Sequence, residues 1–336
     1  MQQDGPSGDL LEVLARLGYG DAENPPRCTA LTGGVSSDIW RVDLADGPVC
    51  VKRALAKLKV AADWRAPVAR NAYEVAWFET AARFAPGAAP EVLAHDAEAG
   101  LFVMPYLDPA EHRNWKEEML AGRVDPAFAK GVGQVLARIH AGTADDTGVA
   151  ARFDTDEIFH AIRLEPYLEA TARAHPELAA ELTALVEVTA STKRALVHGD
   201  VSPKNILVGP DGPVFLDAEC AWYGDPAFDL AFCLNHFLLK ARFVDGRAGE
   251  LLGAFKAMAG GYLAGVDWEA AAELEARVAR LLPGLFLARV DGKSPVEYLT
   301  EAAQQDQVRR VAAALLRRPI HRLNDIADHW GEEIGA

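Results

Sequence analysis

The chain has 336 residues, half of them hydrophobic, which is enough for a large core in one or two domains. Its formal net charge of −15 argues against a nucleic-acid partner, because phosphate binding needs clustered Lys and Arg, and it favours a cationic or neutral small substrate. The start of the chain does not resemble a signal peptide, and no apolar run reaches the ~18 residues of a membrane helix. We therefore expect a cytoplasmic protein with no membrane partner. The four cysteines form no CxxC pair, so free thiols are expected.

The first third of the chain alternates short β-like runs with two helices. In order, we predict a helix over 9–18, strands over 28–31, 39–44 and 49–52, a helix over 68–84, and strands over 91–95 and 101–105. Ala45-Asp46-Gly47 is a hairpin turn between the second and third strands, and Pro86 and Gly87 end the second helix. These elements predict a small sheet that carries one main helix.

The rest of the chain is rich in Ala and Leu at helical spacing. We predict helices over 126–141, 156–170, 176–194, 227–242, 247–264, 268–282 and 295–317. Only 196–217 differs, with β-like runs on both sides of the turn Gly209-Pro210-Asp211-Gly212. We expect an α+β chain of two lobes: 1–104 as an antiparallel-sheet N-lobe, 105–110 as a hinge, and 111–336 as a helical C-lobe.

The segment from His198 to Leu207 carries the clearest chemistry. Asp200 and Asn205 lie five residues apart on a loop that runs into a strand, and Asp217 ends the next apolar run. Phosphoryl transfer from a magnesium-bound nucleotide needs a carboxylate to orient the attacking hydroxyl and oxygen ligands for the metal. We therefore predict Asp200 as the catalytic base and Asn205 and Asp217 as Mg²⁺ ligands. A cap or turn role is the alternative for Asp200, and an Asx-turn is the alternative for Asn205.

Lys52 ends the third predicted strand and precedes a helix that contains Glu74 and Glu79. In a kinase-type site a strand Lys binds the nucleotide phosphates and pairs with a helix Glu. We predict Lys52 and Glu74 for these roles, with Glu79 as the competitor one turn further along.

The loop Thr32-Gly33-Gly34-Val35-Ser36-Ser37 joins the first two predicted strands. Glycines let the backbone approach phosphate, and serine hydroxyls can donate to it. We predict Gly33, Gly34, Ser36 and Ser37 as nucleotide-binding residues, although a Gly-Gly hairpin is the ordinary alternative. No Walker A lysine follows the loop.

The run from Phe102 to Leu107 connects the two predicted lobes. The order of the elements places it beside an adenine ring, so Met104 and Tyr106 are predicted to contribute hinge contacts. A strand that ends in a turn is the alternative.

Other polar residues near the motif have less certain roles. Glu219 is either a further metal or water contact or a solvent-exposed carboxylate, and Lys204 either contacts the transferred phosphate or is a surface charge. Asp229 is expected to anchor the catalytic loop by hydrogen bonds, and His198 and His140 are expected to be packed rather than catalytic.

These motifs together resemble the aminoglycoside phosphotransferase and choline kinase-like superfamily of small-molecule kinases over residues 28 to 240. The resemblance implies a bilobal protein-kinase-like fold, with ATP and Mg²⁺ in the cleft and a hydroxyl of a small molecule as acceptor. Ser202 and Lys204 depart from the loop usual in the family. Asp217-Ala218-Glu219 is similar to the metal motif of methylthioribose kinase, whereas the Gly33-Gly34 loop is more like that of aminoglycoside kinases.

The sequence thus predicts an ATP- and Mg²⁺-dependent phosphotransferase for an aminoglycoside-like compound, an amino alcohol or a sugar. The alternatives are a methylthioribose kinase-like sugar kinase and a nucleotide-binding pseudokinase without turnover. A protein kinase is disfavoured, because no activation segment fits between Asp217 and Asp225. Acidic residues lining the pocket would indicate an aminocyclitol as acceptor. An aromatic cage would indicate choline. A pair of arginines would indicate an anionic acceptor or a sugar. Nothing in the sequence indicates an oligomeric state.

Overall fold

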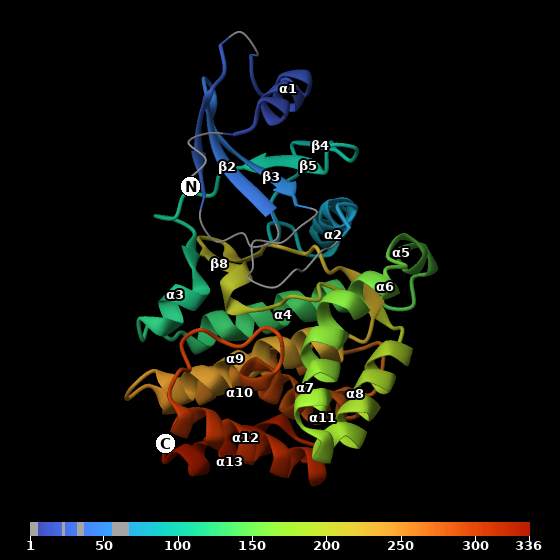
Figure 1. Ribbon diagram of the computed structural model, residues 1–336, viewed down its shortest axis with the longest axis vertical. Helices are drawn as coiled ribbons and strands as arrows, with labels where there is room; N and C mark the ends of the chain where they lie inside the picture. Colours follow the sequence, from blue (N-terminus) through green and yellow to red (C-terminus); the bar gives the residue numbers. More distant parts are fainter. Residues whose placement is uncertain (1–5, 22–23, 32–36, 56–66) are drawn as a thin grey trace.

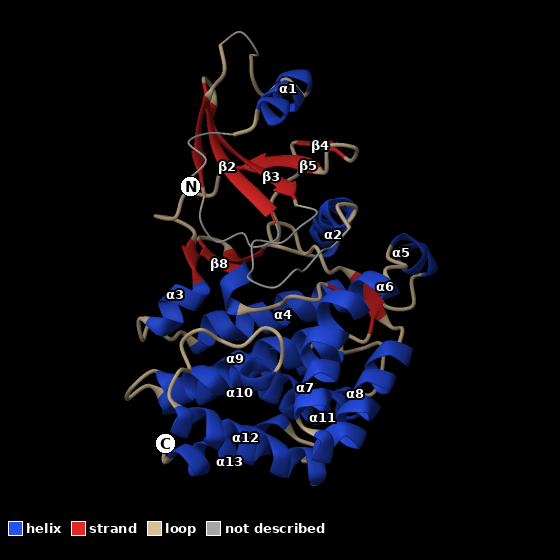
Figure 2. Ribbon diagram, in the orientation of Figure 1, coloured by secondary structure: helices blue, strands red, loops and turns tan. Residues whose placement is uncertain are grey.

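The structure is a computed structural model that describes residues 6–21, 24–31, 37–55 and 67–336. Figure 1 shows a small part built on a sheet, above a larger part made mostly of helices. Figure 2 shows the same division, with the main sheet at the top and most helices below. The expected α+β architecture is therefore confirmed, and we call the two parts the small lobe and the large lobe.

The small lobe contains α1 (Gly8–Arg16), β1 (Arg27–Ala30), β2 (Ser37–Leu44), β3 (Gly47–Ala54), α2 (Arg70–Phe84), β4 (Ala94–Asp96) and β5 (Leu101–Pro105). Its described strands lie in the order β1-β2-β3-β5-β4, and every neighbouring pair is antiparallel. β2 and β3 form the predicted hairpin, in which Gly47 takes a φ of +121°. The strand expected over 91–95 is displaced and shorter, because pairing with β5 covers Ala94–Asp96.

Side chains of the sheet alternate between two apolar layers, as the pleat of a strand requires. One layer packs against Leu10, Val13 and Leu14 of α1, and it consists of Trp40, Val42, Val49, Val51, Leu101 and Val103. The opposite layer faces α2 and includes Cys50, Phe102 and Met104. Because Lys52 lies two residues after Cys50, its side chain shares the face that α2 covers.

The large lobe contains β6 (Arg113–Asn114), α3 (Trp115–Leu120), α4 (Pro126–Thr143), α5 (Thr147–Arg152), α6 (Asp156–Phe159), a π-helical segment (His160–Glu169), α7 (Ala170–Ala174), 3₁₀ turns (Pro176–Leu178 and Pro203–Asn205), α8 (Ala179–Ser191), β7 (Ala195–Val197), β8 (Ile206–Gly209), β9 (Gly212–Phe215), β10 (Trp222–Gly224), α9 (Ala227–Phe243), α10 (Ala248–Leu263), α11 (Ala271–Asp291), α12 (Ala302–Arg317) and α13 (Leu323–Ile334). β6, β8 and β9 form one small sheet, and β7 and β10 form another. Among the described residues, no helix is both long and apolar enough to span a bilayer.

Several helices of the large lobe differ from the sequence expectation. The segment predicted as one helix over 156–170 is interrupted by the π-helical stretch, which contains Pro166. The predicted end at 282 is wrong, since α11 continues through Pro283, whose neighbours on both sides are buried and packed. The last predicted helix begins at Ala302 rather than at 295, because residues 292–301 turn back and Val296 N donates to the Arg289 carbonyl at 2.9 Å. The hydrophobic pattern does not predict α3, α5, α13 or β10.

Glycines bring α4 and α10 close together in the core of the large lobe. A Cβ atom at Gly133 of α4 would lie 2.3 Å from the Met258 carbonyl oxygen, and one at Gly261 of α10 would lie 2.6 Å from the Lys130 carbonyl oxygen. Only the absence of a side chain permits this approach. The close packing of these two helices positions His140 of α4 beneath the loop that follows β7.

This packing predicts opposite effects for two glycine substitutions on the same helix. Gly131→Ala has open space around the added methyl, so it should raise the free energy of unfolding by about 1 kcal/mol through helix propensity. Gly133→Ala should lower the free energy of unfolding by about 1–3 kcal/mol, because the backbone of α10 blocks the methyl. Urea unfolding followed by circular dichroism measures both, and equal stabilisation by the two changes would contradict the packing.

Candidate active site

The loop after β7 is held in place by one buried carboxylate. Asp229, in the first turn of α9, accepts hydrogen bonds from the backbone N–H groups of His198 at 2.7 Å and Gly199 at 2.8 Å. His140 contacts the same carboxylate from α4 at 3.3 Å. The expected anchoring role of Asp229 is therefore confirmed. His198 and His140 are fully buried and hydrogen-bonded, as expected for packed residues.

Gly199 makes the turn that leads into Asp200. Its φ is +78°, and a Cβ atom there would lie 2.6 Å from the carbonyl oxygen of Cys220. Both the left-handed backbone and the close approach require glycine at this position. The glycine of the His-Gly-Asp motif is thus a steric requirement of the loop.

Asp200 is 4% exposed and lies between two cationic side chains. Its Oδ2 atom is 2.9 Å from the guanidinium of Arg163 and 3.4 Å from Nζ of Lys204. The side-chain nitrogen of Asn205 donates to the Asp200 carbonyl oxygen at 3.1 Å. This bond fixes the orientation of the Asn205 amide and leaves its oxygen available to a cation.

Lys52 joins the small lobe to the end of β9. Its Nζ atom lies 2.8 Å from Oε1 of Glu74 on α2 and 2.5 Å from Oδ1 of Asp217. Glu79, the competitor on the same helix, instead pairs with Arg152 at 2.6 Å. The structure thus brings Lys52, Glu74 and Asp217 together, and it selects Glu74 over Glu79 as the partner.

Burial and mutual attraction set the charges of this cluster. Burial raises the pKa of Glu74 to about 7, although Lys52 opposes the shift. Burial acts against ionisation of Asp217, but Lys52 and Lys204 outweigh it and hold the pKa of this carboxyl well below its usual range. Burial likewise acts against the Lys52 ammonium, yet Asp217 and Glu74 raise the pKa of Lys52 above its ordinary value. Lys52 and Asp217 are therefore charged at neutral pH.

Asp217 has backbone strain as well as a functional side chain. Its φ is +66°, a left-handed conformation that few residues other than glycine adopt, with Asp and Asn among those that tolerate it. Asp217 and Asn205 together offer a carboxylate and an amide oxygen. This donor set fits Mg²⁺, which prefers oxygen ligands and is normally shared with nucleotide phosphates. In the described part of the chain, no cluster of three or more His, Cys, Asp or Glu side chains could hold a metal by itself.

The residues with uncertain roles occupy defined places. Glu219 is mostly buried and pairs with Nε of Arg70 at 2.9 Å, so it is not a solvent-exposed carboxylate. Ser202 is buried, and no partner for its hydroxyl exists among the residues that the structure describes. Lys204 is half exposed beside Asp200.

The predicted nucleotide contacts are described only in part. Gly33, Gly34 and Ser36 lie outside the described residues. Ser37 begins β2 and is buried opposite Ala54 of β3. Met104 is buried and pairs with Cys50 of β3. On the other side of β5 the pairing with β4 ends at Val103, which lies opposite Ala94, so residues 104–106 extend beyond the outer strand.

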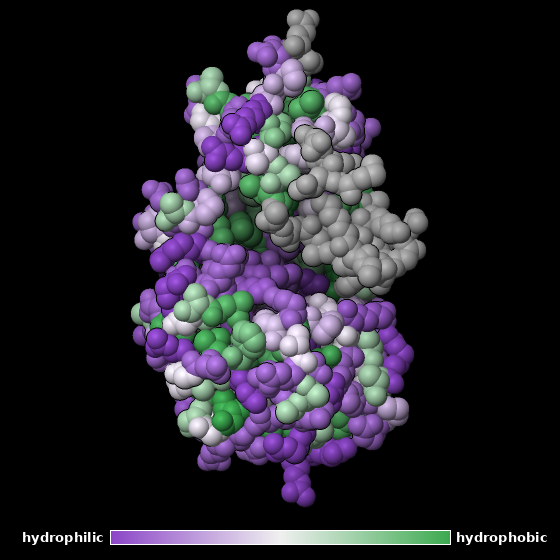
Figure 3. All heavy atoms as spheres, turned by 60° about the vertical axis from the view of Figure 1, so that its left-hand side comes forward, coloured by the Kyte–Doolittle hydropathy of each residue, from purple (hydrophilic) through white to green (hydrophobic). Residues whose placement is uncertain are grey.

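The surface is hollowed between the two lobes. Figure 3 shows this hollow with hydrophobic atoms on part of its upper wall and a band of hydrophilic residues across its lower side. An amphipathic hollow of this kind suits a ligand with one apolar and one charged end.

Comparison with known proteins gives the family. A model of the phosphotransferase enzyme family matches residues 27–274, which include every predicted site residue. The chain belongs to this family. A methylthioribose kinase of Yersinia pseudotuberculosis is 27% identical over 227 residues, which cover 60% of this chain and 55% of that protein. The chain thus spans about half the length of the curated relatives it matches.

Solved structures of small-molecule kinases have the same fold as this chain. A choline/ethanolamine kinase family protein from Mesorhizobium loti has a TM-score of 0.55 at 18% identity, covering 97% of this chain and 99% of that one. An amicoumacin kinase has a TM-score of 0.58 at 13% identity, covering 98% and 100% of the two chains. These similarities confirm the bilobal fold of small-molecule kinases.

The sequence analysis does not predict one residue that the structure places beside Asp200. Arg163 comes from the π-helical segment, bonds to the Gly199 and Ile162 carbonyl oxygens, and pairs with Asp200. A signal was present, because an arginine in the apolar run Ile162-Arg163-Leu164 precedes Pro166, and a proline within a helical pattern often marks an irregular, functional turn.

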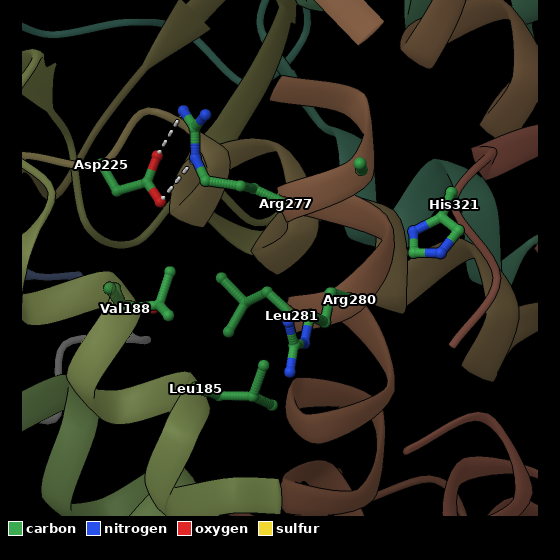
Figure 4. A pocket seen from close by; sticks show the side chains of 9 residues that line it. Leu185, Val188, Asp225, Arg277, Arg280, Leu281 and His321 are labelled. Atoms are coloured by element: carbon green, nitrogen blue, oxygen red, sulfur yellow. Dashed lines mark hydrogen bonds and ion pairs between the residues drawn. The ribbon is translucent and has the colours of Figure 1, made fainter. Parts of the chain in front are cut away.

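A separate pocket of about 180 Å³ lies in the large lobe, between α8 and α11. In Figure 4, Leu185, Val188 and Leu281 form its apolar side, while the carboxylate of Asp225 faces Arg277. It shares no lining residue with the cluster around Lys52 and Asp200. This pocket is therefore separate from the cluster that carries the predicted site residues.

The buried pair with Asp200 predicts a strong effect of replacing Arg163. Arg163→Met should lower the free energy of unfolding by about 3 kcal/mol, because it leaves a buried carboxylate without its main partner. The control is Arg173→Met, which removes an exposed pair with Glu165 and should cost less than about 1 kcal/mol. Urea unfolding compares the two, and a loss for Arg163→Met no greater than that of the control would contradict the assigned pairing.

Proposed function

We propose that the protein transfers the γ-phosphate of ATP, in the presence of Mg²⁺, to a hydroxyl group of a small molecule. The observation that carries the proposal is the contact of Lys52 with Asp217 at 2.5 Å, beside a loop that holds Asp200 and Asn205 in fixed orientation. Family membership supports the reaction class. The amicoumacin kinase with the same fold was solved with AMP-PNP and Ca²⁺, which supports a nucleoside triphosphate and a divalent cation. An ATP-dependent reaction also agrees with the expected cytoplasmic location.

The small lobe would bind the nucleotide. Lys52, held by Glu74, would contact the phosphates, and the loop with Gly33, Gly34, Ser36 and Ser37 would cover them. We place the hinge at 105–110, between an N-lobe of 1–104 and a C-lobe of 111–336. Backbone groups of Met104 and Tyr106, beyond the end of β4, would be available to the adenine edge.

The large lobe would hold the metal and the acceptor. Asn205 and Asp217 would hold Mg²⁺, which supplies neutralisation of the phosphate charge when bound. Glu219, through Arg70, would keep the metal-binding turn in place. Asp200 would orient the acceptor hydroxyl and take its proton at a carboxylate oxygen, and Arg163 would fix the direction of that carboxylate.

One of the two alternative functions has specific support. A methylthioribose kinase-like sugar kinase is favoured by the 27% identity with the Yersinia pseudotuberculosis protein. A pseudokinase that binds nucleotide without turnover would share the fold, but Lys52, Asp200, Asn205 and Asp217 are all present and in mutual contact or on one loop. Turnover measurements separate these functions.

Replacement of the proposed base tests the reaction. Asp200→Asn should lower the turnover number by about 10²–10⁴-fold, because the amide cannot accept the proton of the acceptor hydroxyl. Calorimetric affinity for MgATP should stay near that of the wild type. The control Asp211→Asn changes an exposed Asp in the β8–β9 turn and should leave turnover unaltered. Turnover by Asp200→Asn similar to that of the control, in a coupled ADP-release assay, would rule out Asp200 as the base.

Replacement of the proposed metal ligand tests the role of Mg²⁺. Asp217→Asn preserves side-chain size and tolerates the left-handed backbone, so the turn should survive. Its affinity for ATP in the presence of Mg²⁺ should fall about tenfold or more, since even indirect disturbance of a metal site costs this much. Affinity measured in EDTA should change much less. An unchanged gain in affinity on adding Mg²⁺ would remove Asp217 from the metal site.

A further inference from the structure

A small basic cavity lies directly beside the catalytic loop. It has a volume of about 40 Å³, and its polar walls come from three helices, the loop and the connection between α11 and α12. The ionisable and hydroxyl side chains that line it are those of Lys116, Lys204, His236, Lys240, Arg289, Glu297 and Tyr298, so one carboxylate stands among several basic groups. In Figure 1 the connection between α11 and α12, orange-red in the view, passes in front of α9, and the contact of Tyr298 with Lys240 agrees with this.

The cavity adjoins the proposed catalytic base. His236 and Lys240 are one turn apart on the same face of α9, beneath the loop. Lys204 lines the cavity, and its Nζ atom is 3.4 Å from Oδ2 of Asp200. A molecule that fills the cavity can therefore extend past Lys204 to the carboxylate of Asp200.

Lys240 is a buried amine that forms no direct ion pair with a carboxylate of the described residues, although Glu297 lines the same cavity. It is only 1% exposed, and across the residues described in the structure its ammonium has neither a hydrogen-bond acceptor nor a carboxylate partner. Its side-chain interaction is with the ring of Tyr298, whose centroid is 5.1 Å from Nζ. The hydroxyl of Tyr298 is itself enclosed without a partner there. Burial favours the neutral form of such an amine, and a bound anion would favour its protonated form, so the site gains attraction for an anion when one is present.

Arg289 is a second cation of the same kind. It donates to the hydroxyl groups of Tyr167 at 3.2 Å and Ser294 at 2.9 Å, and the ion pairs of the described residues give it no carboxylate. Its Nε atom is buried and has no acceptor in that part of the chain. Lys240 and Arg289 thus line one cavity from two helices, and neither forms an ion pair with a carboxylate of the described residues.

The nearby carboxylates are already paired. Glu297 forms an ion pair with Lys116, and Asp200 is paired with Arg163 and Lys204. As a result, burial and then the neighbouring charge of Lys116 lower the pKa of Lys240 to about 7. Burial and then Lys240 keep the pKa of His236 well below its ordinary value. Basic side chains thus outnumber the single lining carboxylate, that of Glu297, and a bound anion would balance the excess.

We infer that this cavity binds an anionic group of the acceptor, a carboxylate or a phosphate, and so holds the hydroxyl at Asp200. The inference rests on the proposed function and names the acceptor class as hydroxylated acids or phosphate esters. A buried water needs about 10–15 Å³, so 40 Å³ accommodates about three small heavy atoms, the number in a carboxylate or in the O–P–O portion of a phosphate whose other oxygens lie outside the cavity. The rest of the acceptor would lie in the hollow above.

The cavity disfavours the cationic substrates suggested by the acidic composition. The net charge of −15 describes the whole chain, whereas an aminoglycoside or amino alcohol seated here would meet the like charges of Lys240, Arg289 and Lys204. Like charges brought together out of water repel strongly. The charge of the side chains that line the cavity is therefore better evidence about the acceptor than the net charge of the whole chain.

Binding of simple probes tests the site separately from catalysis. D-Glycerate, inorganic phosphate and neutral glycerol are titrated calorimetrically at constant ionic strength into the wild type, Lys240→Met, Tyr298→Phe and the control Lys256→Met, which alters an ion-paired lysine on the outer side of α10. Glycerate or phosphate should bind the wild type and the control alike and glycerol should not. Lys240→Met should weaken anion binding about tenfold or more, and Tyr298→Phe should weaken it less. Glycerate and phosphate distinguish a carboxylate site from a phosphate site.

Stability separates a binding role of Lys240 from a structural one. Loss of an unpaired buried charge should leave Lys240→Met at least as stable to heat as the wild type without anion. Added glycerate or phosphate should then raise the melting temperature of the wild type but not of Lys240→Met. A lower melting temperature of Lys240→Met without anion, or equal anion binding by all four proteins, would overturn the inference.

Turnover links the site to the acceptor. In a coupled ADP-release assay, glycerate and gluconate are compared with glycerol and sorbitol, which lack the carboxylate, and with choline and kanamycin as cations. Acceptors with an anion should show a higher kcat/KM, which Lys240→Met reduces and Lys256→Met does not, while MgATP affinity stays constant. Preference for neutral or cationic acceptors, unchanged in Lys240→Met, would overturn the inference but leave the phosphotransferase proposal intact. MgATP binding with no turnover of any acceptor would contradict the proposed function instead.

Discussion

Lys52 is a cation enclosed between two carboxylates from different parts of the chain, Glu74 of α2 and Asp217 after β9. Burial disfavours the charged form of each of the three groups on its own. In the cluster, Lys52 and Asp217 are charged at neutral pH, and the pKa of Glu74 is about 7. The alternation of β3 places Lys52 on the face that α2 covers, so the register of the sheet determines whether the ion pairs can form. The contact therefore couples the sheet, α2 and the turn at Asp217.

The large lobe provides a rigid base for that contact. Trp77 of α2 packs edge-on against His198, with ring centroids 4.7 Å apart, and Phe215 N donates to the Ala88 carbonyl oxygen at 2.8 Å. Asp229 holds the loop from below through two backbone N–H groups. Because these contacts involve buried groups with fixed directions, Asp200, Asn205 and Asp217 are preorganised before any ligand binds.

The motifs of the site could be predicted because each depends on local chain geometry. Asp200 and Asn205 lie on one short loop, Lys52 lies within the hairpin strand β3, and Gly199 makes a local turn, so each is set by a short stretch of chain. Arg163 could not be predicted in the same way, since a π-helical turn and contacts between distant segments bring it to Asp200. Tertiary packing also explains why α11 passes through Pro283 and why α13, whose Trp330 donates to the Leu238 carbonyl oxygen at 2.9 Å, was not expected. The basic cavity could not be predicted from the sequence for the same reason, because Lys204, Lys240 and Arg289 come from three separate segments.

Family membership and the cluster around Lys52 lead to one central claim, that a phosphoryl group passes from ATP to a hydroxyl of an acceptor positioned at Asp200. Phosphorus-31 NMR of the wild type with MgATP and each anionic, neutral and cationic acceptor in turn tests this most directly, because it observes the fate of the phosphoryl group. The account predicts a new phosphomonoester resonance that grows in proportion to ADP. Loss of ATP to inorganic phosphate alone, at the same rate with and without the acceptor, would contradict it.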